Sequence, residues 1–135
     1  MSSDQSKERV VKSFLFGGEA DAFAEDGKLI NMLPEEFSYG GVYEGPEGAR
    51  RYIQEIQAAL RLETLKATEW LTNGDRVVVI GHERSRFTHN DVAYDMDWVH
   101  VNTVRDGKIV EMREYNDTAA MLEAFRAPQN PAAEA

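Results

Sequence analysis

The sequence contains no cysteine, so neither a disulfide bond nor a thiolate metal site is available to it. It has no apolar run approaching the roughly 18 residues that a membrane-spanning helix needs. Positive charge is scarce, because 15 Lys and Arg residues stand against 24 Asp and Glu residues, for a formal net charge of −9. Binding to nucleic acid requires a basic surface that neutralises phosphates, so this composition argues against a DNA or RNA partner.

What is present fits one globular domain of 135 residues, with 42% hydrophobic and 29% charged residues. The polar start MSSDQSKERV does not have the pattern of a signal peptide, and we expect a cytoplasmic protein. The strand alternation places His82 and His100 on opposite faces, and His89 lies near a turn, so a histidine metal site is not expected. The chain also has no phosphate loop, nucleophile elbow or dinucleotide fingerprint, and we expect no cofactor.

The first sixty residues are predicted to be mainly helical. A helix over residues 5–16 has one apolar stripe and ends at Gly17-Gly18. A short second helix is expected over residues 19–25, and a short strand and loop over residues 36–43. A third helix is predicted from Pro46 to Leu60, since Pro suits the first turn of a helix. We interpret the three apolar stripes as core packing.

From Leu62 the apolar period changes to two, which indicates strands. The predicted strands are residues 64–71, residues 76–88 and the two arms of the segment Tyr94–Asp117, and a helical turn follows over residues 118–125. The tail of residues 127–135 has two prolines and little to bury, so we expect it to be disordered and the domain to be residues 1–126. Helices followed by a meander of antiparallel strands predict an α+β fold.

The segment YDMDWVHVNTVRDGKIVEMREYND is predicted to be a β-hairpin around which the rest of the chain is arranged. Asp-Gly between alternating apolar residues is a strong hairpin signal. Two registers compete. A two-residue Asp106-Gly107 turn pairs Arg105 with Lys108, whereas a type I turn with Gly107 in a bulge pairs Val104 with Lys108. The apolar pattern alone does not decide between them, because a slip of one residue moves every side chain to the other face.

The bulged register, with a two-residue turn at Asn90-Asp91 in the preceding hairpin, gathers one group of polar and aromatic side chains on one face. Carboxylates on a partly apolar surface have raised pKa values, which suits acid–base chemistry near neutral pH. In the other interpretation the carboxylates are solvated on the outer face and the histidine is a hydrogen-bonded sheet residue. The expected rungs are Glu83, Trp98 and Glu114; Gly81, His100 and Met112; and Ser85, Met96 and Asn116, with Gly81 leaving room beside His100.

With these motifs in place, the chain resembles the SnoaL-like, ketosteroid isomerase-like superfamily, also called nuclear transport factor two-like. The resemblance covers Lys7 to Phe125 and rests on GGVYEGPEGARRYI, NGDRVVVIG and WVHVNTVRDGKIVEMREYNDTAAM. It implies a curved antiparallel sheet wrapped around three N-terminal helices, forming a cone with an apolar pocket. It also implies a homodimer through the outer sheet face, where we expect Val99, Val101, Ile109 and Tyr115.

The superfamily includes isomerases, polyketide cyclases, dehydratases, epoxide hydrolases and members without chemistry, so the resemblance does not fix a reaction. The two catalytic aspartates of the epoxide hydrolases match Glu114 and Glu83, and this match favours the bulged register. The arginine between those aspartates matches Gly81, which departs from the pattern. The first-helix tyrosine of ketosteroid isomerase matches Phe14, and its strand aspartate has no counterpart near Tyr39.

We therefore expect a small cofactor-free enzyme that acts on an apolar, oxygen-bearing metabolite by acid–base chemistry. In this hypothesis His100 or Glu114 moves the proton and Glu83 orients or shares it. The substrate-binding residues would be Trp98, Met96, Met112, Ser85, Asn116 and Gly81. The competing hypothesis is a non-catalytic small-molecule-binding or dimerisation module with the same pocket.

Overall fold

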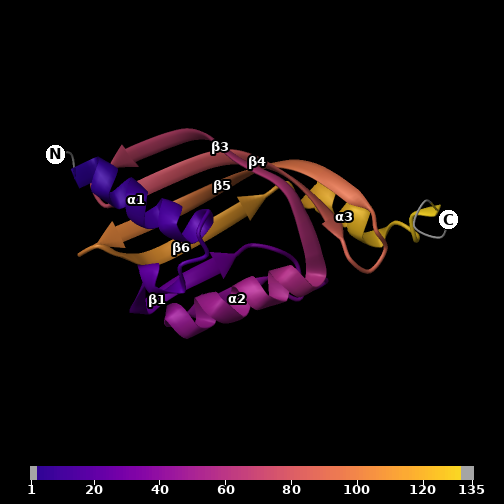
Figure 1. The fold of residues 1–135 in the computed structure, drawn as a ribbon, viewed down its shortest axis with the longest axis horizontal. Coiled ribbons are helices and arrows are strands. Elements are labelled where there is room, and N and C mark those ends of the chain that lie inside the picture. Colours follow the sequence, from indigo (N-terminus) through magenta and orange to yellow (C-terminus); the bar gives the residue numbers. More distant parts are fainter. Residues whose placement is uncertain (1–2, 132–135) are drawn as a thin grey trace.

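One curved sheet of six strands carries the fold, and three α-helices pack against it (Figure 1). The structure is a computed structural model that describes residues 3–131. In chain order its elements are α1 (Ser3–Leu15), the 3₁₀ turn η1 (Ala20–Ala22), β1 (Phe23–Asn31), β2 (Gly41–Glu44), α2 (Gly45–Ala59), β3 (Leu60–Asn73), β4 (Arg76–Phe87), β5 (Ala93–Arg105), β6 (Lys108–Asn116) and α3 (Thr118–Arg126).

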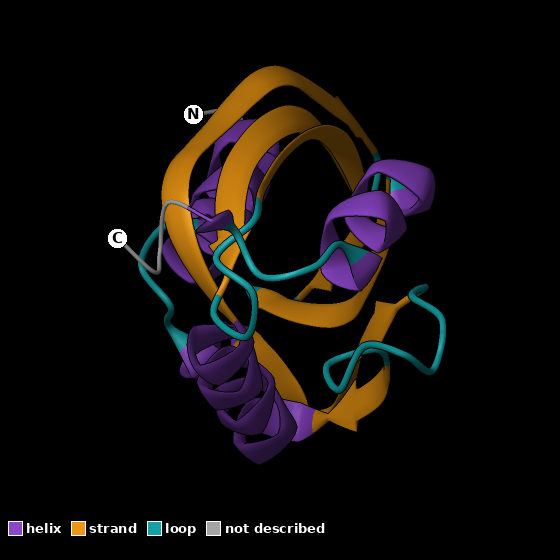
Figure 2. Ribbon diagram, turned by 90° about the vertical axis from the view of Figure 1, so that its right-hand side faces the viewer, coloured by secondary structure: helices purple, strands orange, loops and turns teal. Residues whose placement is uncertain are grey.

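The strand order is β2-β1-β6-β5-β4-β3, and neighbours are antiparallel except β1 and β6, which are parallel. Viewed end-on, the strands curve into an open arc around the interior (Figure 2). The predicted α+β fold with a curved sheet and helices is confirmed, although the sheet is mixed. The parallel pairing matters for the interior, because it sets Asn31 at the end of β1 beside Glu114 on β6.

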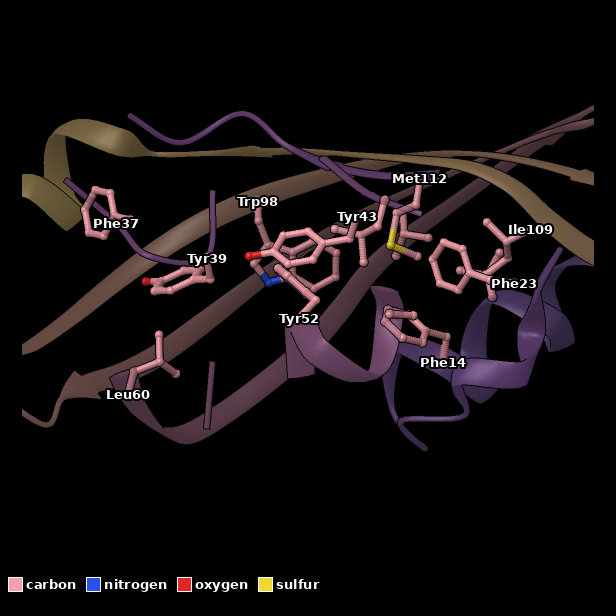
Figure 3. Packing of buried hydrophobic residues seen from close by; sticks show 14 of the residues in the cluster. Phe14, Phe23, Phe37, Tyr39, Tyr43, Tyr52, Leu60, Trp98, Ile109 and Met112 are labelled. Carbon is pink, nitrogen blue, oxygen red and sulfur yellow. The ribbon is translucent and has the colours of Figure 1, made fainter. Parts of the chain in front are cut away.

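The predicted second helix is wrong beyond its first turn. Only Ala20–Ala22 is helical, and β1 begins at Phe23. In β1 the buried residues alternate at Gly27, Leu29 and Asn31, which is the period of a strand and not of a helix. Phe23 itself packs edge-on against Phe14 of α1, with ring centroids 4.9 Å apart, and so anchors the first helix to the sheet (Figure 3).

The predicted first and third helices are present. In α1, Val11 and Phe14 are buried. In α2, Pro46 lies in the first turn and the small residues Gly48 and Ala49 let the helix approach β1 and β2 closely, with Tyr52 buried on the same face. Asp117 caps α3 by accepting a hydrogen bond from the Ala120 N–H at 3.2 Å, as its position before Thr118 predicts.

The loop between β4 and β5 is longer than predicted, and the register shifts by two residues. The Asp91 N–H donates to the Phe87 carbonyl at 3.0 Å, which closes a four-residue loop in place of a two-residue turn at Asn90-Asp91. The cause is Asn90, whose side-chain amide donates to the Ala124 and Ala127 carbonyls at the end of α3, at 2.8 and 3.0 Å. The observed pairs are Gly81 with Trp98, Glu83 with Met96, and Ser85 with Tyr94.

The hairpin of β5 and β6 matches neither predicted register along its whole length. Asp106 and Gly107 both have positive φ, 51° and 74°, as a two-residue type I′ turn requires, so Arg105 pairs with Lys108. A bulge follows one pair later, where Val110 is the extra residue on β6. The preferred bulged turn is therefore wrong, and Trp98 lies opposite Asn116, His100 opposite Glu114, and Asn102 opposite Met112.

Beyond the bulge these register errors are of two residues, so the face assigned to each predicted site residue is unchanged although the rungs are wrong. The space left by Gly81 lies under Trp98 and not beside His100. A Cβ on Gly81 would stand 2.2 Å from Cζ2 of the indole and 2.3 Å from the Lys66 carbonyl oxygen. Glycine is therefore required for Trp98 to lie flat across β4.

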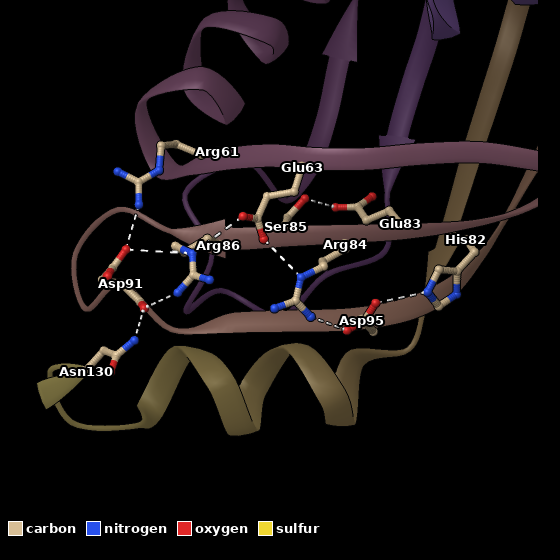
Figure 4. A network of polar contacts seen from close by, with 10 residues as sticks. All are labelled: Arg61, Glu63, His82, Glu83, Arg84, Ser85, Arg86, Asp91, Asp95 and Asn130. Carbon is tan, nitrogen blue, oxygen red and sulfur yellow. Dashed lines mark hydrogen bonds and ion pairs between the residues drawn. The ribbon is translucent and has the colours of Figure 1, made fainter. Parts of the chain in front are cut away.

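The outer face of the sheet has a charged part and an apolar part. The charged part is a network of exposed ion pairs around Arg84, which contacts Asp95 at 2.6 Å and Glu63 at 3.1 Å (Figure 4). Val99, Val101 and Tyr115 are on the apolar part, as expected. Ile109 is not, because the bulge at Val110 turns it into the core, where it is fully buried.

None of the helices within residues 3–131 is long and apolar enough to cross a bilayer. The predicted disorder of residues 127–135 falls partly on residues 132–135, which lie outside the described residues. Nearer the helix, the Asn130 N–H donates to the Asn90 carbonyl at 2.8 Å and its side chain donates to the Asp91 carbonyl at 3.0 Å.

Candidate active site

A cavity of about 330 Å³ lies between the concave face of the sheet and the helices. This volume is at the small end of the range of roughly 300–1,000 Å³ that is typical of ligand pockets, so it suits a compact ligand. Its wall is mostly apolar, with polar groups in two places. The lining residues are Phe14, Leu15, Gly18, Asn31, Leu33, Tyr39, Tyr52, Ile53, Ile56, Gln57, Leu60, Leu62, Leu65, Glu83, Tyr94, Met96, Trp98, His100, Glu114, Asn116 and Met121.

Six of the nine predicted site residues line this cavity: His100, Glu114, Glu83, Trp98, Met96 and Asn116. The other three, Met112, Ser85 and Gly81, do not line it. Met112 and Ser85 are fully buried in the wall, and Gly81 lies under the Trp98 indole. Ser85 still contacts the site, because its hydroxyl donates to Glu83.

The first polar place is built around Glu114 of β6, which is 5% exposed. Its Oε2 accepts a hydrogen bond of 2.5 Å from the Tyr52 hydroxyl of α2, and its Oε1 lies 3.5 Å from Nε2 of His100. The Asn31 amide donates to the Tyr52 oxygen at 3.2 Å, and the Asn116 amide donates to Asn31 Oδ1 at 3.1 Å. Groups from β1, β5, β6 and α2 thus converge on one carboxyl.

Burial sets the charge states of Glu114 and His100. Loss of water contact, together with the nearby charge of Glu83, raises the pKa of Glu114 from 4.5 to about 7, although the Tyr52 hydrogen bond acts in the opposite direction. Burial also lowers the pKa of His100 from 6.5 to about 3. The imidazole therefore stays neutral at physiological pH, while the carboxyl beside it gains or loses a proton near neutrality.

His100 has one ring nitrogen that is not used by the protein. Its ring stacks against the Trp98 indole, with centroids 4.4 Å apart and planes 33° apart. Nε2 faces Glu114, but no described residue makes a hydrogen bond with Nδ1. An unpaired polar atom in the interior costs about 1–3 kcal/mol, so Nδ1, which is buried on a residue that lines the cavity, is the ring nitrogen with capacity left for a ligand.

The second polar place is built around Glu83 of β4. Glu83 lies four residues along that strand from Val79, and Val79 pairs with His100 across β4 and β5. Glu83 Oε2 accepts hydrogen bonds from Ser85 Oγ at 2.8 Å and from the Tyr94 hydroxyl at 3.0 Å. Burial raises the pKa of Glu83, and these two hydrogen bonds partly offset that rise. The two carboxyls thus occupy separate parts of one cavity.

The sequence reasoning missed several polar residues of the cavity, among them Tyr52, Tyr39 and Asn31. The helical stripe of α2 predicts that Tyr52 is buried, but its hydrogen bond to Glu114 depends on how the helix docks on the sheet. Tyr39 comes from the irregular segment before β2, and Asn31 comes from β1, which the sequence pattern does not predict as a strand. A tyrosine among small residues on a buried helical stripe is the one signal that could have pointed to the site, because a buried hydroxyl needs a partner.

Comparison with protein families identifies a SnoaL-like domain over residues 18–112. The chain belongs to the SnoaL-like family. The match starts after α1 and ends in β6 at Met112, so it contains Glu83 and His100 but stops just before Glu114.

Solved structures of SnoaL-like and NTF2-like proteins have the same fold. An NTF2-like protein from Burkholderia xenovorans is 28% identical, with a TM-score of 0.78 over 93% of this chain and 97% of that one. TerC, crystallised with polyporic acid, is 23% identical (TM-score 0.74, covering 90% and 99%). A candidate isomerase from Bacillus subtilis is 17% identical (TM-score 0.78, covering 96% and 100%). A comparison with curated protein sequences gives no match.

The raised pKa of Glu114 predicts how the free energy of unfolding changes with pH. The folded protein holds this proton more tightly than the unfolded chain, so the contribution to stability is complete below pH 4.5 and is lost as the pH rises through about 7. Relative to Glu114→Gln, which does not titrate, the wild type should lose about 3 kcal/mol of unfolding free energy over this interval. Denaturant unfolding at a series of pH values measures the difference.

The depressed pKa of His100 has the opposite effect, because it increases the stability of the folded state as the pH rises from about 3 to 6.5. Both proteins contain His100, so using Glu114→Gln as the reference cancels this contribution to the unfolding free energy. Unfolding free energies of the two proteins that run parallel from pH 4.5 to 7 would contradict the assignment of a raised pKa to Glu114.

Proposed function

We propose that the protein is a cofactor-free enzyme that transfers protons on a compact, largely apolar, oxygen-bearing metabolite. The observation that carries this proposal is the pairing of Glu114, whose pKa is about 7, with a cavity-lining histidine that has a free ring nitrogen. A group that titrates near the working pH can both accept and return a proton. Isomerisation, cyclisation, dehydration and addition of water all use such a step.

His100 is the group that meets the substrate, and Glu114 stores the proton behind it. One oxygen of Glu114 accepts a hydrogen bond from the Tyr52 hydroxyl, and the other lies 3.5 Å from His100 Nε2. With Glu114 ionised, His100 carries its own proton on Nε2. Its Nδ1 then takes a proton from a substrate C–H or O–H bond, whose electron pair stays on the substrate, and the Nε2 proton passes to Glu114 Oε1.

This relay never needs a charged imidazole. His100 begins and ends neutral and only exchanges one tautomer for the other, which agrees with the lowering of its pKa to about 3. The proton comes to rest on the carboxyl whose pKa suits it, and the reverse sequence returns it to a different atom of the product. Tyr52, held by Asn31, positions Glu114 and is a positioning residue rather than a catalytic one.

Glu83 binds and orients the substrate in this account. Its Oε1 makes no hydrogen bond with a described residue and is free to accept one from the substrate. Trp98 and Met96 lie between the two carboxyls and contact the apolar body of the ligand. Membership of the SnoaL-like family, and a fold shared with a candidate isomerase, support a proton-transfer reaction without choosing one.

The test uses a panel of compact oxygen-bearing compounds in deuterated water, with carbon-bound deuterium followed by NMR. The wild type should introduce deuterium, at a rate that increases with pH and levels off above about pH 7, because Glu114 must be ionised to receive the proton. Glu114→Gln should lower the rate by roughly 10²–10⁴ and remove this pH dependence. His100→Phe, which keeps a ring against Trp98, should lower it similarly.

Glu111→Gln is the matched control, because Glu111 lies on the outer face, where Arg113 contacts it at 2.7 Å. If Glu111→Gln lowers the rate as much as Glu114→Gln, or if both cavity variants retain full activity, the enzymatic proposal fails and the cavity only binds its ligand.

We also propose that two copies associate through the apolar part of the outer sheet face. Two rows of neighbouring side chains form this surface, and Leu71 and Tyr115 in it are 56% and 41% exposed. Burying such a surface is favourable, and large exposed apolar patches mark interaction sites. The rows are Leu71, Val78 and Val101, and Ile80, Val99 and Tyr115.

Sedimentation equilibrium at micromolar concentration should give a dimer, and Val101→Glu, which puts a charge beside Val78 in this surface, should give a monomer. Val42→Glu is the control, since Val42 is 60% exposed on β2 at the far edge of the sheet. A monomeric wild type would rule out this association.

A further inference from the structure

We infer that the cavity recognises a positively charged amine, which pairs with Glu83 and lies against the aromatic side chains around it. The inference rests on the proposed function in that the cavity is taken as the substrate site, and it names the chemical class of that substrate. Three observations carry it: a free carboxylate oxygen, the absence of a countercharge, and the aromatic wall.

The free oxygen is Oε1 of Glu83. Both hydrogen bonds to this carboxylate, from Ser85 and Tyr94, go to Oε2. Glu83 lies on the concave face and is partly exposed, whereas Glu114 is almost fully buried and both its oxygens are engaged. Glu83 is therefore the carboxylate that a ligand can reach directly.

The cavity contains no positive charge that would balance Glu83. None of the described residues that line it is a lysine or an arginine. Arg84 and His82, its neighbours along β4, point to the outer face, where Asp95 pairs with both of them (Figure 4). Asp97 also pairs with His82 there. A cationic ligand would supply the missing charge in a poorly hydrated site, and an anionic ligand would be repelled there.

Aromatic residues lie near the same carboxylate. Met96 is opposite Glu83, and Tyr94 and Trp98 are the next inward-facing residues on either side of it. The charge of Glu83 helps to raise the pKa of Tyr39, which also lines the cavity, and this places that tyrosine close to Glu83. The faces of tyrosine and tryptophan rings attract ammonium ions, and quaternary ammonium groups are bound in this way.

An alcohol would also satisfy Glu83 Oε1, but it would leave the carboxylate charge unbalanced and would gain little from the rings. The net charge of −9 adds a long-range attraction for cations over neutral compounds. A compact ammonium ion also fits a cavity of about 330 Å³. The combination therefore favours an amine over an alcohol, a carboxylate or a phosphate.

The experiment measures binding by isothermal titration calorimetry with three probes of one shape. Choline carries the positive charge, dimethylbutanol is its uncharged carbon isostere, and trimethylacetate is a comparable anion. The wild type should bind choline about tenfold or more tightly than dimethylbutanol, as an ion pair and cation–π contacts together predict. Trimethylacetate should not bind.

Two variants assign the preference to the site. Glu83→Gln keeps the shape and removes the charge, so choline should lose its advantage while dimethylbutanol binds as before. Glu111→Gln, on the outer face, should change neither affinity. Tyr39→Phe keeps the ring and should retain choline binding, whereas Tyr39→Leu should weaken it severalfold.

The inference is wrong if dimethylbutanol binds as tightly as choline, if trimethylacetate competes with choline, or if Glu83→Gln leaves the choline affinity unchanged. No measurable choline binding would also overturn it. Because calorimetry needs no turnover, these outcomes are separate from the enzymatic proposal. That proposal stands if Glu114→Gln abolishes deuterium exchange without any cation preference, and it fails if exchange survives that variant while the preference remains.

Discussion

A carboxyl that has been removed from water is the constraint on which the interior of this protein depends. Among the described residues, the carboxyl of Glu114 contacts the Tyr52 hydroxyl and His100 Nε2, and neither group is a permanent cation. In such surroundings a carboxylate keeps its charge only with difficulty, so its pKa moves to about 7. The same burial drives the neighbouring imidazole in the opposite direction, and the pair can therefore hold one proton without creating a buried ion pair.

The curved sheet makes this arrangement possible. The parallel pairing of β1 with β6 places Asn31 beside Glu114, and the amide then holds the Tyr52 hydroxyl in position. Gly81 lets the Trp98 indole lie across β4, and His100 stacks against that indole. Each polar group of the site is thus fixed by an element that is itself fixed by packing, and this rigidity is what a proton relay requires.

Much of the fold could be predicted from the sequence, because the change from a helical period to a period of two is a local signal. The inward face of β5 and β6 was also predictable, since alternation assigns Trp98, His100 and Glu114 to one side. The register was not predictable, because it depends on contacts between distant segments. Asn90 lengthens one loop by binding the end of α3, and the bulge at Val110 lies one pair beyond the turn.

The site residues from outside the meander were missed for the same reason. Tyr52 and Asn31 reach Glu114 only after α2 has docked on β1 and β1 has paired with β6. Met112 and Ser85 face the interior as expected but are covered by other side chains, so facing inward did not place them on the cavity. Alternation predicts the face on which a side chain lies, and packing decides whether it reaches a ligand.

The most direct test of the central claim is the tautomer of His100, followed by nitrogen-15 NMR as the pH is varied through 7. We expect a neutral ring throughout, with the proton on Nδ1 when Glu114 is protonated and on Nε2 when it is ionised, and with the change centred near pH 7. A doubly protonated imidazolium below pH 7, or a tautomer that does not change, would contradict the relay.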